Sequence, residues 1–166
     1  MDAIMNRRSI RRYTGKDVSE DLVTELIRAA MNAPSAMNRR PWHFIVIRDR
    51  EKLDSVPNFH RHAKMIEEAT MAVLVCGDLR LQDNMGYMCA DLGAATENLL
   101  VKATDMGLGT VWLGIYPREE RMAPLSKMLH LPENIVPFSL VPVGYPAEKK
   151  KFEDRYDKGR VHRDGW

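Results

Sequence analysis

Apolar residues recur at helical spacing in two parts of the chain. The first set is Leu22, Val23, Leu26, Ile27, Ala30 and Met31. Ser19 stands before this set as a typical N-cap and Pro34 follows it, which predicts an amphipathic helix between these two residues. The second set extends over residues 85–106, and Gly107 follows it where a capping glycine is common. We expect this longer segment to be the central helix.

Short apolar runs rich in β-branched residues predict four strands. They cover residues 42–47, 71–76, 109–113 and 138–143. Pro142 lies inside the last run, which favours an edge strand or a strand end at that point. A further helix is expected to begin with Pro117 in its first turn and to stop before Pro132. No linker or repeat interrupts the series, so we expect one domain over residues 1–166.

The pattern changes at Ala147. Residues 147–166 are polar, show little helical or strand periodicity and cannot form a core of their own. The apolar side chains in this tail are Phe152, Tyr156, Val161 and Trp166. Two alternatives remain open from the pattern alone: the tail is disordered, or these side chains anchor it on another surface.

Composition and charge narrow the class of protein. The 166 residues are 45% hydrophobic and 29% charged, which is ordinary for a folded globular chain. The formal net charge of +2 is too small to indicate nucleic acid or a membrane surface. Cys76 and Cys89 have no CxxC spacing, which argues against a zinc site and a disulfide framework. The longest wholly apolar run, residues 71–76, is far shorter than the roughly 18 residues of a membrane span, so we expect a cytoplasmic protein.

Basic residues gather at both ends of the chain. Arg7, Arg8, Arg11 and Arg12 fall within six positions, and Ser9 lies among them. Guanidinium groups bind phosphate bidentately and keep their charge, so this cluster favours a phosphorylated ligand. On spacing alone, a solvated basic turn or a weak nucleic-acid patch is the more common explanation. If the tail folds back, its Lys158-Gly159-Arg160 segment would meet the same phosphate.

The sequence gives little support for other kinds of ligand or metal site. Two prolines bracket the polar loop 34–41, which suits recognition of a heterocycle but also fits a helix stop followed by a strand start. His60 and His62 would diverge on a helix and have no third ligand nearby, so no metal site is predicted. GxGxxG and GxxxxGK[ST] motifs are absent from the sequence, which argues against a Rossmann site and a P-loop.

Six segments together resemble the nitroreductase family of FMN-dependent oxidoreductases. They are RRSIR at 7–11, APSAMNRRPWHF at 33–44, DLGAATENLLVKA at 91–103, GLGTVWLG at 107–114, VGYP at 143–146 and KGRVHRDGW at 158–166. Each motif is weak alone, but the ordered set extends from about residue 4 to residue 166. The resemblance implies an α+β fold with a mixed, mainly antiparallel sheet flanked by helices. It also implies a homodimer in which each C-terminal tail wraps the partner, with one FMN per subunit at the interface.

The resemblance assigns expected roles to matching positions. Arg7, Arg8 and Ser9 would contact the FMN phosphate and ribityl chain, and Lys158 and Arg160 would add the tail's contribution to the phosphate. The implied reaction uses NADH or NADPH as electron donor and a flat small-molecule acceptor such as a nitroaromatic or a quinone. Donor and acceptor would bind in turn, by a ping-pong mechanism.

Three further sets of positions would surround the flavin ring. Arg11 matches a cation beside N1 and O2, where its charge would favour reduction. Leu113 and Gly114 match a segment whose backbone amides face N5 and O4. The residues expected to contact the flavin of the other subunit are Pro34, Ser35, Ala36 and Asn38.

The sequence departs from the family pattern at two places. Arg40 stands where many members have Gln, and Met85-Gly86-Tyr87 replaces a stretch that commonly carries Trp. A cationic Arg40 near the acceptor would favour anionic substrates. Three other readings stay open: a specialised flavin reaction such as reductive dehalogenation, a flavin protein without turnover, and a module that binds nucleic acid through its arginine-rich start.

Overall fold

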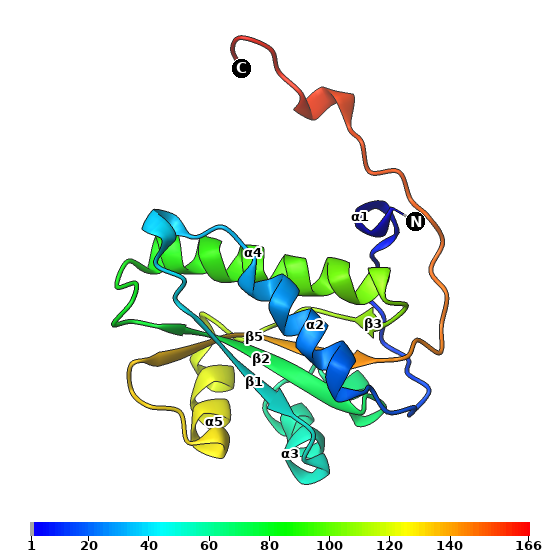
Figure 1. Cartoon of the computed structure of the whole chain (residues 1–166), viewed down its shortest axis with the longest axis vertical. Coiled ribbons are helices and arrows are strands. Elements are labelled where there is room, and N and C mark those ends of the chain that lie inside the picture. The colour runs from blue at the N-terminus through cyan, green and yellow to red at the C-terminus, as the bar shows by residue number, and fades with distance from the viewer. Residues whose placement is uncertain (1) are drawn as a thin grey trace.

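A five-stranded antiparallel sheet forms the centre of the computed structural model, which describes residues 2–166 (Figure 1). Its order is β1-β2-β5-β3, and β4 also pairs with β5. The strands are β1 (Trp42–Ile47), β2 (Met71–Asp78), β3 (Gly109–Thr110), β4 (Leu113–Gly114) and β5 (Ile135–Gly144). All four ladders between them are antiparallel. A mixed sheet was expected, but parallel pairing within residues 2–166 is limited to one isolated bridge, between Ser9 and Thr110.

Helices cover both faces of this sheet. The α-helices are α1 (Ala3–Asn6), α2 (Glu20–Met31), α3 (Arg50–Ser55), α4 (Met85–Asp105) and α5 (Glu119–Leu129). Short 3-10 turns are η1 (Ala36–Asn38), η2 (Val56–Asn58), η3 (Lys64–Glu67) and η4 (Lys158–Arg160). Figure 1 shows α2 and α4 on one face of the sheet and α3 and α5 on the other. The two predicted long helices are confirmed, and the Ser19 hydroxyl caps α2 by accepting from the Leu22 N–H.

Strand β2 divides the core between the two faces, because successive side chains of a strand point to opposite sides. Met71, Val73 and Val75 pack with buried residues of α2 and α4. Ala72, Leu74 and Cys76 pack with the layer formed by α3 and α5. Every residue of β2 is buried as a result. Burial on both faces explains why the sequence here is continuously apolar and does not alternate.

Three predicted features differ in the structure. The strand expected over residues 109–113 is split into β3 and β4, although one register with β5 continues across the gap. This register places Val111 opposite Pro142, which has no N–H to contribute to the ladder. β5 lies inside the sheet, so the edge-strand alternative is wrong, and Pro142 lies two residues before the strand end. Pro117 follows a cis peptide bond and precedes α5 instead of starting it.

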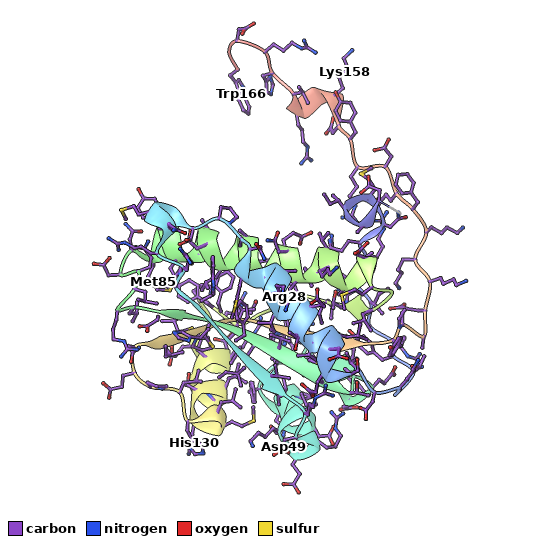
Figure 2. The ribbon with its side chains drawn as sticks, viewed as in Figure 1. Arg28, Asp49, Met85, His130, Lys158 and Trp166 are labelled. Carbon is purple, nitrogen blue, oxygen red and sulfur yellow. The ribbon has the colours of Figure 1, made fainter. Side chains whose placement is uncertain are left out.

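The C-terminal tail leaves the rest of the chain after the last strand. Residues 151–166 are all exposed, and Trp166 is fully so. Figure 2 shows Lys158 and Trp166 well away from the sheet and its helices. The far part of the tail therefore does not fold back over its own chain. Of the four apolar side chains predicted as anchors, Tyr156, Val161 and Trp166 are exposed, and the half-exposed Phe152 ring faces the Arg8 guanidinium at 5.8 Å. Of the helices described, none is long and apolar enough to cross a membrane.

Candidate functional site

The arginine-rich segment at the start of the chain lies against β3. The Ile10 N–H donates to the Thr110 carbonyl at 2.9 Å. A Cβ atom on Gly109 would come within 2.7 Å of the Ile10 side chain, so glycine permits this close approach. The buried Tyr13 hydroxyl donates to the Ile10 carbonyl at 2.8 Å and holds the end of the segment. These contacts bring the basic cluster beside the 109–114 strand region.

Two carboxylates hold the same segment from outside. Glu148 Oε1 accepts from the Arg11 N–H at 2.6 Å, and Glu68 Oε2 accepts from the Tyr13 N–H at 3.1 Å. The hydrogen bond from Lys150 and then that from the Arg11 N–H lower the pKa of Glu148. The hydrogen bonds from the Tyr13 N–H and then from Arg12 lower the pKa of Glu68, so both acids are ionised at neutral pH. They fix the backbone at Arg11 and leave its side chain available.

Arg11 lies between two cavities. The first, of about 370 Å³, has one acidic group against six cations. It is lined by Arg7, Arg8, Ser9, Arg11, Lys150, Lys151, Glu153 and Arg155. The second, of about 470 Å³, is less polar and is lined by Arg11, His60, His62, Met65, Val111, Trp112, Leu113, Gly114 and Arg121. The structure thus brings together Arg7, Arg8, Ser9, Arg11, Leu113 and Gly114 of the predicted site.

Gly114 forms an open part of the second cavity. A Cβ atom built on it would meet no atom within 4 Å, so the backbone here is accessible to a flat ligand. Its carbonyl accepts from Arg121 Nη1 at 2.7 Å and lies 3.2 Å from His60 Nε2. The orientation of this peptide group is consequently fixed by two side chains from elements far apart in the sequence.

His60 is a site residue that the sequence did not reveal. It is 2% exposed, and its Nδ1 atom has no hydrogen-bond partner within the described chain. Burial and then the charge of Arg121 lower its pKa, which favours the neutral ring with the proton on Nε2. The expected divergence of His60 and His62 is wrong: both line the second cavity, because residues 59–63 form a turn between η2 and η3 and are not helical. No local sequence signal distinguishes this histidine.

The loop of Pro34, Ser35, Ala36 and Asn38 lies apart from both cavities, near the start of α4. The Ser35 hydroxyl accepts from the Arg40 N–H at 3.0 Å, and the Ala36 N–H donates to Asp91 Oδ1 at 2.9 Å. Met37, Asn38 and Arg40 have φ values near +50°, which is unfavourable for residues other than glycine. Such strain persists where function requires it. Within one chain the structure does not bring this loop to Arg11.

Most of the other cations that the sequence analysis singled out have partners within the chain. Arg7 pairs with Glu97 at 2.9 Å, and Arg12 pairs with Glu68 at 2.9 Å. Arg8 donates to backbone carbonyls, including those of Lys151 and Glu153 in the tail. Arg40 donates to Asn38 within its own loop, and Arg160 pairs with Asp157. These internal contacts speak against a continuous basic surface for nucleic acid.

Lys158 and Arg160 are not brought to the first cavity by their own chain (Figure 2). The cations that do join Arg7 and Arg8 there come from an earlier part of the tail: Lys150, Lys151 and Arg155. Within residues 2–166 no group of three or more His, Cys, Asp or Glu side chains could hold a metal ion. The site is built mainly of cations, backbone groups and two histidines, of which the buried His60 is neutral. Joined at Arg11, its two cavities suit a flat ring with an anionic chain attached.

Comparison with known proteins, by family model, by sequence and by structure, gives matches to one family. The family model described as "Nitroreductase family" matches residues 4–76 and 60–145. A relative from Archaeoglobus fulgidus, named "Putative NADH dehydrogenase/NAD(P)H nitroreductase", is 46% identical over 98% of this chain and 96% of its own. A structure of the same description from Parabacteroides distasonis has a TM-score of 0.95 and 40% identity, covering 99% of this chain and 96% of that one.

A third similarity concerns a bound cofactor. A solved structure from Desulfovibrio desulfuricans, described as a "putative nitroreductase in complex with fmn", has a TM-score of 0.87. It is 32% identical, and the match covers 99% of this chain and 95% of that one. The expected α+β fold of the family is confirmed by these structural matches.

Proposed function

Because this chain belongs to the nitroreductase family, we propose that it is an FMN-dependent oxidoreductase that takes electrons from NADH or NADPH and passes them to a flat acceptor such as a nitroaromatic or a quinone. The observation that carries the proposal is the pair of cavities joined at Arg11. One is rich in cations, and the other has an open backbone surface at Gly114. FMN has the matching parts, a phosphate and a planar ring.

The residues present fit this cofactor. Arg7, Arg8 and Ser9 would hold the phosphate and ribityl chain, in a cavity where cations exceed acids by five. On binding, Arg7 would exchange its pairing with Glu97, whose side chain is about half exposed, for the phosphate. A guanidinium bound to phosphate gains a bidentate, charge-assisted contact, which makes this exchange favourable.

Arg11, Leu113 and Gly114 would surround the ring. Bound FMN would supply the redox chemistry, taking up a hydride from reduced nicotinamide and passing electrons to the acceptor. Arg11 would supply positive charge beside the ring, and the backbone N–H groups of Leu113–Gly114 would orient it. His60 and Arg121 hold the Gly114 peptide group in place. No protein nucleophile is needed, and donor and acceptor would occupy the space over Gly114 in turn.

A second copy of the chain would complete the site. Pro34, Ser35, Ala36 and Asn38 lie away from the Arg11 cavities, so we expect them to contact the flavin of the partner subunit. The tail, with exposed fractions of 59% at Phe152 and 72% at Tyr156, would wrap the partner. Lys158 and Arg160 would reach an FMN phosphate in that arrangement. The positive φ values of Met37, Asn38 and Arg40 support this role, because strained backbone is concentrated at ligand-binding sites.

The visible absorption spectrum of the purified protein tests the proposal directly. We expect oxidised-flavin bands that bleach when NADH or NADPH is added anaerobically and return when a quinone or nitroaromatic is added. Double-reciprocal plots should then give parallel lines. A colourless protein that neither binds added FMN nor gains thermal stability from it would overturn the proposal.

A further inference from the structure

A third cavity adjoins the space over Gly114 and differs from it in charge. It has a volume of about 630 Å³ and lies between residues 57–62 and the start of α5. His62 and Arg121 line both this groove and the Gly114 cavity, so the two spaces share a wall. The other charged residues of the groove are Arg61, Arg118 and Glu120. None of the residues expected to hold FMN lines it.

The groove has an excess of two positive charges. Three guanidinium groups face one carboxylate, and no other acid lines it among the described residues. Arg118 and Glu120 are paired only loosely, at 3.6 Å with both side chains more than half exposed. Arg61 donates its Nε–H to His62 Nε2 at 2.9 Å, which leaves its terminal amino groups for a ligand. An anion would therefore replace only the weak Arg118–Glu120 contact and would meet the unused terminal amino groups of Arg61.

We propose that this groove binds the pyrophosphate of NADH or NADPH while the nicotinamide ring stacks on the flavin held in the adjoining Gly114 cavity; this inference rests on the proposed function. A pyrophosphate carries two negative charges, which match the excess charge of the groove. Guanidinium groups are the side chains best suited to phosphate oxygens, because they bind them bidentately. A carboxylated acceptor has a single charge and would need only one of the three. The groove is also the largest of the three adjoining spaces.

Calorimetric titration of the FMN-loaded protein with ADP-ribose isolates the pyrophosphate contact from electron transfer. We expect Arg61→Gln and Arg118→Gln each to raise the Kd by about tenfold, the loss of roughly 1.4 kcal/mol. Glu120→Gln should lower the Kd, because it removes the only acid of the groove. Arg28→Gln is the matched control and should leave it unchanged, since Arg28 lies on α2, on the opposite face of the sheet (Figure 2). Equal affinities for wild type and all variants would overturn the proposal.

Steady-state kinetics provide the second readout. Arg61→Gln should raise KM for NADH without changing kcat. It should leave oxidation of 1-benzyl-1,4-dihydronicotinamide, a donor without phosphate, as in wild type. If the variant instead raised KM for 4-nitrobenzoate alone, the groove would be an acceptor site and the proposal wrong. Failure of wild type to accept electrons from either donor would refute the proposed function, while the ADP-ribose titration would still decide the groove.

Discussion

His60 Nε2 lies 3.2 Å from the carbonyl oxygen of Gly114, the same oxygen that accepts the Arg121 guanidinium at 2.7 Å. The shared acceptor requires a proton on Nε2, and burial with the charge of Arg121 lowers the pKa of the ring. The folded protein therefore binds a proton at His60 less readily than the unfolded chain, whose histidine pKa is about 6.5. Protonation of His60, a residue of the candidate site, therefore affects the free energy of unfolding.

This relationship predicts a pH-dependent stability. As pH falls below about 6.5, the unfolded chain takes up the His60 proton before the folded protein does, so the free energy of unfolding decreases. His60→Gln keeps a donor for Gly114 but does not titrate, and its urea midpoint should change less between pH 7.5 and pH 5.5 than that of wild type. His62→Gln, at an exposed histidine of the same turn, is the control. An unchanged pH dependence in His60→Gln would show that this ring does not contribute.

Two glycines of the 109–114 region should respond differently to a methyl group. Gly114→Ala adds a Cβ atom that meets no protein atom, so we expect a stability change within about 0.5 kcal/mol. The methyl group would project into the cavity and weaken FMN binding, measured by fluorescence titration. Gly109→Ala would collide with Ile10 and cost about 1–3 kcal/mol in chemical denaturation. Unweakened FMN binding by Gly114→Ala would remove Gly114 from the ring surface.

Arg11 should influence the reduction potential of bound FMN. Its side chain lines both FMN cavities, and a cation there stabilises the negative charge that reduction adds to the ring. Arg11→Gln should lower the midpoint potential by on the order of 30 mV, about 1.4 kcal/mol for a two-electron couple. Arg12→Gln removes a neighbouring cation that lines neither cavity and pairs with Glu68, so it should leave the potential unchanged. Equal potentials in wild type and Arg11→Gln would contradict the assigned role.

The features that could be predicted from the sequence are those that depend on residues close together along the chain. Ser19 and Gly107 mark helix ends through local capping, and the burial of β2 on both faces follows from its continuous apolar run. The break between β3 and β4 depends on Pro142 in another strand, which no local pattern records. Arg7, Arg8 and Ser9 were predicted because they form one motif. His60 and Arg121 meet only through Gly114, so their part in the site required the folded structure.

The tail should serve both assembly and cofactor binding. Its apolar side chains are exposed in one chain, with Trp166 fully so, and a second subunit is the surface that would cover them. Ending the chain after Arg155 removes Tyr156, Val161 and Trp166 but keeps Glu148 and its contact with Arg11. We expect this protein to be monomeric by sedimentation equilibrium and to retain little FMN.

The double variant Lys158→Gln with Arg160→Gln separates the two roles of the tail. It keeps every apolar anchor, so it should sediment as a dimer. Two phosphate contacts would be lost, and a charge-assisted hydrogen bond is worth roughly 1.5–3 kcal/mol, so the Kd for FMN should rise by at least about tenfold. Lys149→Gln with Arg163→Gln removes the same charge from other exposed positions of the tail and should bind FMN as wild type does. If both double variants lost FMN affinity equally, the tail would act through its net charge, and Lys158 and Arg160 would have no specific contact with the phosphate.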